Sequence, residues 1–136
     1  MIAALQEQVV PVLRTKGFSG SFPHFRRHTE SAIHLLTFQF NKWGGSFVVE
    51  VASCGTEGMT TCWGKQIPPK EMKAHDVHPS LRLRLGSSAK KPDHWFKFDG
   101  RLAWNPYKRA AKAVLPLLNT QAEEWWNRAQ ESVKNV

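Results

Sequence analysis

Two apolar segments joined by a pair of glycines constrain the fold of this chain more than any other feature. Residues 32–42 and 46–53 are rich in aromatic and β-branched side chains, and Gly44-Gly45 lies between them. A two-residue glycine turn of the primed type is a common connection between paired antiparallel strands. The pattern therefore predicts a β-hairpin that turns at Gly44-Gly45.

A two-residue turn also predicts the register of the hairpin, because Trp43 then faces Ser46. The pairs that follow outward are Lys42 with Phe47, Asn41 with Val48, Phe40 with Val49, Gln39 with Glu50, Phe38 with Val51, Thr37 with Ala52 and Leu36 with Ser53. Alternate residues of a strand point to opposite faces, so this register places most apolar side chains on one face. Gln39, Asn41 and Glu50 lie on the opposite, polar face.

Helical periodicity marks both ends of the chain. Residues 2–16 have apolar side chains at helical spacing, and Pro11 predicts a kink or a break within them. A second helix is expected to begin at Asn105-Pro106, where an N-cap residue precedes a proline at the first helical position. Thr120 and Glu123 have the spacing of a capping box, which predicts that a separate final helix begins there.

Shorter extended segments lie between the helical ends. Residues 81–85 and 94–98 are expected to form strands, and Pro23 limits residues 18–28 to an edge strand or an irregular extended piece. The glycines and prolines of residues 54–73 predict a long loop, in which residues 60–63 are the candidate for a short extended piece. Strands in the middle and helices at both ends indicate an α+β fold. We expect an antiparallel β-sheet of about four to six strands, covered on one face by the N-terminal and C-terminal helices.

Length and composition suit a single folded domain that spans residues 1–136. The hydrophobic fraction of 41% supplies a core for a chain of 136 residues. No segment approaches the roughly 20 consecutive apolar residues that span a bilayer, and the first ten residues lack the basic region of a signal peptide. Two cysteines, Cys54 and Cys62, are too few for a disulfide framework. We therefore expect a cytoplasmic protein with no membrane association.

Several short motifs are shared with a known family. They are Lys16-Gly17-Phe18 after the first helix, residues 38–47 across the hairpin, Leu83-Arg84-Leu85-Gly86, and the aromatic pairs Trp95-Phe96 and Trp125-Trp126. In these motifs, and over most of its length, the chain resembles the bacterial domain-of-unknown-function family numbered 4304. The resemblance implies a shared fold and a bacterial origin. It supplies no established reaction and no catalytic residues.

The histidines and cysteines are the first candidates for chemistry. Zinc sites use closely spaced ligand pairs, whereas Cys54 and Cys62 are eight positions apart and Pro79 directly follows His78. Solvated loop histidines, including His75 and His78, account for this pattern better. The sequence contains no nucleophile elbow, zinc-protease helix motif or phosphate-binding loop. We expect no metal, no cofactor and no catalytic residue, although acid–base groups from distant positions leave an enzyme as an alternative.

The net charge of the chain is the bulk property that indicates what kind of partner it binds. The formal net charge is +8, from 19 Lys and Arg against 11 Asp and Glu, which favours a partner of opposite charge. We expect a non-enzymatic protein-interaction module, such as a toxin-immunity or antitoxin-like protein, whose partner presents an acidic face. A basic chain argues against an inhibitor that mimics a nuclease substrate. The alternative is a nucleic-acid-binding domain with a basic, aromatic-bearing surface.

The candidate partner-binding surface combines residues of the hairpin with four arginines. Its residues are Trp43, Gln39, Asn41, Glu50, Arg26, Arg27, Arg82 and Arg84. For nucleic acid the basic set extends to His28, Lys90, Lys91, Lys97 and Arg101, with Trp43, Trp63 or Trp95 to stack on bases. Core or helix-to-sheet packing explains the tryptophans better, and the need for a polar outer strand face explains Arg82 and Arg84 equally well.

Overall fold

The helices lie at the two ends of the chain and the strands between them. The computed structural model describes residues 1–61, 63–100 and 104–134, with side chains placed as far as residue 128. The helices are α1 (Ile2–Gln8), α2 (Val10–Thr15), α3 (Pro106–Leu117), the π-helical turn η4 (Leu118–Ala122) and α4 (Glu123–Lys134). The strands are β1 (Ser19–Ser21), β2 (His24–His28), β3 (Ile33–Phe40), β4 (Ser46–Cys54), β5 (Met59–Thr60), β6 (Gln66–Ile67), β7 (Leu83–Arg84) and β8 (Phe96–Lys97). Three 3-10 turns are η1 (Pro69–Glu71), η2 (Ala74–Asp76) and η3 (Pro79–Leu81).

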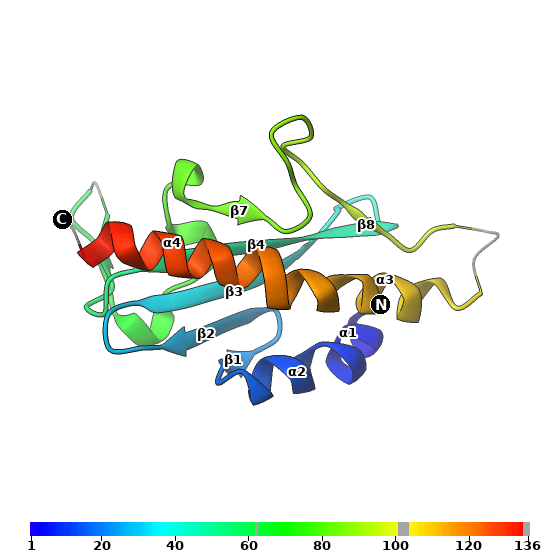
Figure 1. The fold of residues 1–136 in the computed structure, drawn as a ribbon, viewed down its shortest axis with the longest axis horizontal. Helices are drawn as coiled ribbons and strands as arrows, with labels where there is room; N and C mark the ends of the chain where they lie inside the picture. The colour runs from blue at the N-terminus through cyan, green and yellow to red at the C-terminus, as the bar shows by residue number, and fades with distance from the viewer. Residues whose placement is uncertain (62, 101–103, 135–136) are drawn as a thin grey trace.

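Six of the strands in the described residues form one antiparallel sheet. Its order is β1-β2-β3-β4-β7, and β8 pairs with β4 beside β7, on the side of β4 away from β3. The long strands β3 and β4 lie at its centre (Figure 1). Strands β5 and β6 form a separate small hairpin. This arrangement confirms the predicted α+β fold with an antiparallel sheet, and it divides the expected loop at residues 54–73 into short ordered pieces.

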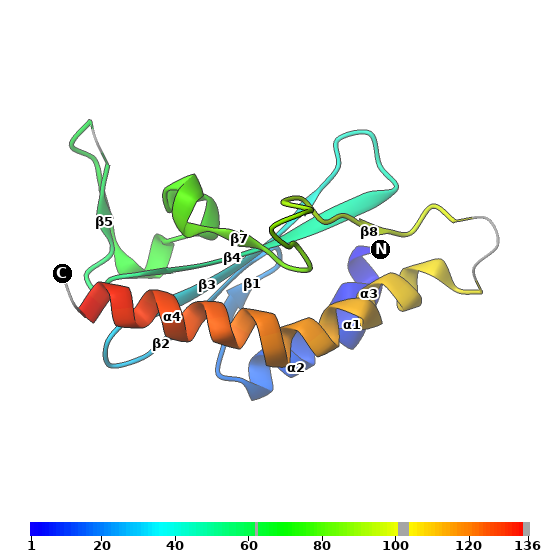
Figure 2. The ribbon, with the colours of Figure 1, turned by 45° about the horizontal axis from the view of Figure 1, so that its top comes forward.

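The helices from both ends of the chain cover one face of this sheet, as predicted (Figures 1 and 2). Helices α3 and α4 run on from each other along this face, and α1 packs against α3. Alternate residues of the strands meet the helices in the main core. Its fully buried side chains include Leu5, Leu13, Phe25, Leu36, Phe47, Val49, Val51, Leu85, Leu118 and Trp126. The period-2 pattern of the strands produces this core.

The opposite face of the sheet has a smaller apolar cluster of its own. Ile33, Leu35, Ala52 and Cys54 project from β3 and β4 on this side. The chain around η2 covers them with Met72, Ala74 and Val77. Strands β3 and β4 are therefore apolar on both faces over part of their length.

The hairpin register differs from the one predicted for a two-residue turn. Phe40 pairs with Phe47 and Phe38 with Val49, where the prediction paired Phe40 with Val49. The turn contains four residues, 42–45, and is closed by a hydrogen bond from the Asn41 N–H to the Ser46 carbonyl at 3.0 Å. The register has shifted by two residues, an even number, so the predicted sorting of side chains between the faces holds.

The side chain of Asn41 accounts for the longer turn. Its Oδ1 accepts a hydrogen bond from the backbone N–H of Trp43 at 2.9 Å, and its carbonyl accepts from the N–H of Gly44 at 2.9 Å. These bonds begin a turn at Asn41, before the two glycines are reached. Gly44 and Gly45 then complete the turn with φ of +83° and +81°, a conformation that favours glycine.

The predicted capping box at Thr120 and Glu123 is wrong. Helix α3 passes through η4 directly into α4, and Thr120 Oγ1 donates a hydrogen bond to the carbonyl of Pro116 at 2.9 Å. Leu118, Ala122 and Trp126, in η4 and α4, are buried on the sheet. The apolar stripe thus continues across the predicted boundary, and packing holds the helix together where the capping pattern indicated a break.

Two other local predictions have different outcomes. Pro11 breaks the N-terminal helix as expected, because α1 ends at Gln8 and α2 begins at Val10 with the proline in its first turn. The strand expected at residues 81–85 is shorter than its alternation suggested. The 3-10 turn η3 occupies Pro79–Leu81, and only Leu83–Arg84 pair with β4.

Candidate functional site

Arg27 lies on the helix-covered face of the sheet, away from the other predicted arginines. Its Nη1 and Nη2 donate to the two carboxylate oxygens of Glu123 at 3.1 and 3.0 Å. Its guanidinium also lies over the rings of Phe18 and Trp126, 4.8 and 5.1 Å from their centroids. Arg27 therefore joins strand β2 to helix α4.

Glu50, Arg82 and Arg84 come together on the opposite face. Glu50 projects from β4 and is only 6% exposed. Its Oε2 accepts a hydrogen bond from Arg82 Nη1, and its Oε1 from Arg84 Nε, both at 3.4 Å. Strand β7 supplies Arg84, which lies opposite Glu50 in the sheet register. Two cations thus share one buried carboxylate, so much of their charge is compensated within the protein.

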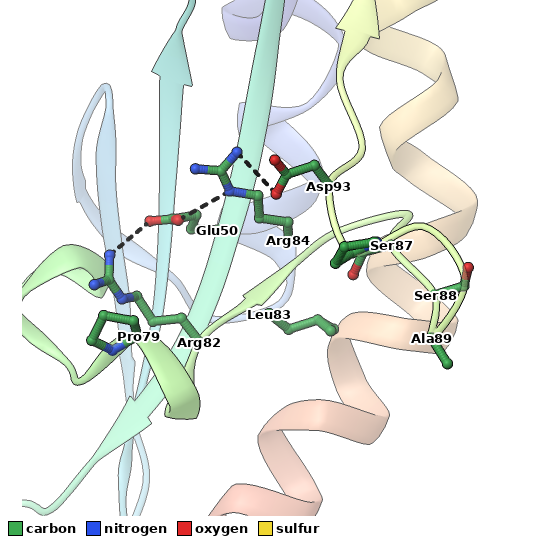
Figure 3. Close-up of a pocket in the computed structure, with 10 residues that line it drawn as sticks. Glu50, Pro79, Arg82, Leu83, Arg84, Ser87, Ser88, Ala89 and Asp93 are labelled. Carbon is green, nitrogen blue, oxygen red and sulfur yellow. Dashed lines mark hydrogen bonds and ion pairs between the residues drawn. The ribbon is translucent and has the colours of Figure 1, made fainter.

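A hollow of about 560 Å³ lies beside these three residues. Figure 3 shows Glu50, Arg82 and Arg84 on one side of it and the loop of residues 87–93 on the other. Asp93 reaches back from that loop, with its Oδ1 3.4 Å from Arg84 Nη1. The rest of the lining is Pro79, Leu83, Ser87, Ser88, Ala89 and Pro92. We call this hollow the Arg84 pocket.

The remaining predicted residues do not line the Arg84 pocket. Arg26 Nε donates to the carbonyl of Met72 at 3.0 Å, and so ties β2 to the segment before η2. Asn41 is engaged in the hairpin turn. Gln39 is exposed on β3, and Trp43 at the turn is 84% exposed, with Lys42 Nζ 5.0 Å from its ring centroid.

A second group of residues gathers where the hairpin turn, β8 and the start of α3 lie in the same half of the molecule (Figures 1 and 2). The N–H of Phe98 donates to the carbonyl of Gly45 at 2.9 Å, which ties the hairpin turn to the chain after β8. We call this group the basic end. Lys91, Lys97, Trp104, Lys108, Arg109 and Lys112 belong to it because they line two hollows there. Trp43 is included as the exposed aromatic side chain of the hairpin turn.

Two hollows meet within the basic end. One of about 530 Å³ includes Lys91, Lys97 and Arg109 in its lining, and another of about 440 Å³ is lined by Trp104, Asn105, Lys108, Arg109 and Lys112. Arg109 belongs to both. Trp104 is 94% exposed. Asp99 is the acidic residue in the lining of the larger hollow.

Arg82 and Arg84 have a carboxylate partner in Glu50, whereas the cations of the basic end have no such partner among the described residues. In the part of the chain that the structure describes, none of Lys91, Lys97, Lys108, Arg109 and Lys112 forms an ion pair. The surface predicted from the sequence did not include the cations of α3. A signal was present, because Lys108, Arg109 and Lys112 recur at helical spacing while Ala111 and Val114 face the core.

Burial shifts the pKa values of His24, His94 and Cys54. Burial, with Lys73 as the next contribution, lowers the pKa of His24, and burial with Lys91 lowers that of His94. Burial raises the pKa of the Cys54 thiol to about 11, with a further increase from Asp76. Among the described side chains, no group of three or more histidine, cysteine, aspartate or glutamate residues is placed to hold a metal ion. Cys62 and Arg101 lie outside the described residues.

None of the helices in the described residues has the length and apolar character needed to cross a membrane. No curated protein and no solved structure matches the chain significantly. The family described as domain of unknown function DUF4304 matches residues 9–128, which is most of the 136-residue chain. The chain therefore belongs to the DUF4304 family.

Proposed function

We propose that this protein is a non-enzymatic interaction module that binds an acidic face of a partner protein through its basic end. The observation that carries the proposal is a set of five cations without ion-pair partners among the described residues, together with two exposed tryptophans. Uncompensated surface charge steers an oppositely charged partner and fixes its orientation. Trp43 and Trp104 add the large aromatic side chains that contribute most binding energy at protein interfaces.

The basic end suits this role better than the arginines predicted from the sequence. Arg82 and Arg84 already share Glu50, so less of their positive charge is available to attract an acidic protein surface. Lys108, Arg109 and Lys112 extend from the solvent-facing side of α3 into water. An acidic partner therefore gains more from contact with α3.

Toxin-immunity and antitoxin-like proteins are the members of this class that we favour. Such proteins act by occupying a target, and they need a complementary surface but no catalytic group. The basic end implies that the occupied target presents carboxylates, which distinguishes it from the phosphate-binding cleft of a nuclease. A bacterial partner encoded beside this protein is the first candidate to examine.

The experiment compares two variants with the same change in net charge. K108E/K112E reverses two exposed lysines of α3, and Glu is also a good helix former. K65E/K70E reverses two exposed lysines in the segment from β5 to η1, away from the basic end. Each tagged protein is used to isolate complexes from nuclease-treated lysate of the native host, and the recovered partner is then purified and titrated.

We expect wild type and K65E/K70E to bind the purified partner in a stoichiometric complex. K108E/K112E should weaken that complex by tenfold or more, which corresponds to about 1.4 kcal/mol. Equal binding by the two variants would remove the basic end from the interface. Failure of the wild type to form a stoichiometric complex with any host protein would contradict the proposed function itself.

A nucleic-acid strand is the second candidate ligand for the same surface. Trp104 is almost completely exposed beside Lys108, Arg109 and Lys112, and an aromatic ring in a basic groove stacks on bases of any sequence. Fluorescence anisotropy with single-stranded oligonucleotides distinguishes this candidate. Binding of the wild type and of K65E/K70E that weakens steeply between about 50 and 200 mM salt, together with no binding by K108E/K112E, would assign the basic end to nucleic acid. If the protein is an interaction module, we expect no salt-dependent binding of the oligonucleotides.

A further inference from the structure

The Arg84 pocket carries an inference that does not depend on the proposed function. It lies between β7 and the loop of residues 87–93, and its lining shares no residue with the basic end (Figure 3). A volume of about 560 Å³ is within the range of small-molecule sites. Pro79, Leu83, Ala89 and Pro92 give it an apolar wall, and Arg84, Ser87 and Ser88 give it polar groups.

The two arginines of the pocket have hydrogen-bond donors to spare. Each donates one hydrogen bond to Glu50, at 3.4 Å, whereas Arg27 reaches Glu123 at 3.0 and 3.1 Å. Arg82 Nε is buried and has no acceptor in the described part of the chain. A guanidinium can donate five N–H groups, so Arg84 retains donors for another oxygen ligand.

Arg84 is held in place from several sides. Its Nε contacts Glu50, and its guanidinium lies 5.6 Å from the centroid of the Trp95 ring. Glu50 and Trp95 therefore orient the guanidinium before any ligand arrives. A preoriented guanidinium binds a carboxylate with two parallel hydrogen bonds and little loss of conformational entropy.

Asp93 occupies the position that a ligand carboxylate would take. Its Oδ1 is 3.4 Å from Arg84 Nη1, an ion pair without hydrogen-bond geometry, and its side chain is 65% exposed. An exposed, loosely held carboxylate contributes little to stability and is readily displaced. The loop that carries Asp93 also forms the outer wall of the pocket, as Figure 3 shows.

We propose that the Arg84 pocket binds a small organic carboxylic acid, with its carboxylate on Arg84 in place of Asp93 and its apolar body against Leu83, Ala89 and Pro92. The charges of the lining favour a single carboxylate. Arg82 and Arg84 balance Glu50 and Asp93, so a monoanion that displaces Asp93 from Arg84 preserves this local balance. A phosphate dianion would bring additional negative charge close to Glu50.

The test uses hexanoate as the probe, with hexanamide and inorganic phosphate as controls for charge and for the type of anion. Binding to the full-length protein is followed by NMR titration. We expect saturable one-to-one binding of hexanoate, with shifts at residues 83–93, and no saturation with hexanamide or phosphate. D93N should bind hexanoate at least threefold tighter, because the competing carboxylate is removed. K90Q, which neutralises an exposed lysine of the same loop outside the lining, should bind like wild type.

R84Q should lose hexanoate binding, but this variant also removes a partner of buried Glu50. D93N therefore decides the question if R84Q does not fold. The proposal is overturned if neither wild type nor D93N binds hexanoate saturably. It is overturned equally if hexanamide or phosphate binds as well as hexanoate, or if D93N and K90Q change the affinity alike.

Discussion

At the residue scale, Glu123 is a charged group that joins the C-terminal helix to the sheet. Its carboxylate accepts hydrogen bonds from Arg27 and from Lys16, and its side chain is 26% exposed. Burial alone would raise the pKa of Glu123, but the hydrogen bonds from Arg27 and Lys16 outweigh it, so the pKa is lowered. The charged form therefore stabilises the fold above the ordinary glutamate pKa, and this stabilisation is lost as the pH falls through the lower folded value.

The variant E123Q tests this contribution. At pH 7 it should lower the free energy of unfolding by about 1–3 kcal/mol, because Arg27 and Lys16 lose a charged acceptor. The difference from wild type should shrink as the pH falls from the ordinary glutamate pKa through the lower pKa of folded Glu123, because the wild-type side chain then also becomes protonated. Urea unfolding at a series of pH values measures both effects. E124Q, at the exposed neighbouring glutamate, should change little, and a difference from wild type that is independent of pH would contradict the assignment to Glu123.

Gly86 is a second residue whose identity the structure explains. Its φ is +91°, and a Cβ at this position would collide with the ring of His94. G86A should therefore lower the free energy of unfolding by more than the about 1–3 kcal/mol expected for left-handed strain alone. G44A is the matched control, because Gly44 has a φ of +83° and a Cβ added there would meet no atom within 4 Å. Thermal unfolding of both variants checks the prediction, and equal destabilisation would exclude the contact with His94 as a cause.

At the element scale, the sequence predicted the strands and their faces better than their ends. Alternation over residues 32–53 identified β3, β4 and the side chains that meet the helices. The register depended on one side-chain hydrogen bond, from the N–H of Trp43 to Asn41, which competes with the glycine turn and has no periodic signal. The boundary expected at Thr120 failed for the converse reason, since burial of Leu118 and Trp126 outweighs a local capping pattern.

The start of α3 is an element boundary that the sequence placed correctly, and it can be tested. Asn105 Oδ1 accepts a hydrogen bond from the N–H of Lys108 at 3.2 Å, while its backbone adopts a φ of +47°. N105A removes the cap and leaves a β-carbon at positive φ, so we expect a loss of about 1–2 kcal/mol in the free energy of unfolding. N105G relieves the backbone and should lose only a few tenths. Chemical denaturation of both variants distinguishes them, and an equally stable N105A would show that the cap contributes nothing.

At the scale of the whole molecule, the candidate surface was harder to predict than the fold. Arg82 and Arg84 share the carboxylate of Glu50, which precedes them by more than thirty residues and is brought near by the sheet register. Periodicity does not report such a pairing, so the sequence assigned these arginines to a free surface. Trp43 was predicted as a surface residue and is exposed. Trp104 and the lysines of α3 became candidates only from the structure, in which the hairpin turn and α3 lie in the same half of the molecule (Figure 2).

The sheet has an apolar cluster on each face, and we expect the smaller cluster to open without unfolding of the main core. Cys54 belongs to the smaller cluster beneath Met72, Ala74 and Val77, and burial raises its pKa to about 11. At pH 8 its thiol should therefore react with a disulfide reagent only after this cover opens. A C62S variant leaves Cys54 as the single cysteine. From its labelling rate we expect a free energy of opening that is smaller than the free energy of global unfolding measured by tryptophan fluorescence. The reason is that few apolar contacts hold the covering segment around η2. M72A should accelerate labelling further. Equal free energies from labelling and fluorescence would mean that both layers unfold as one unit.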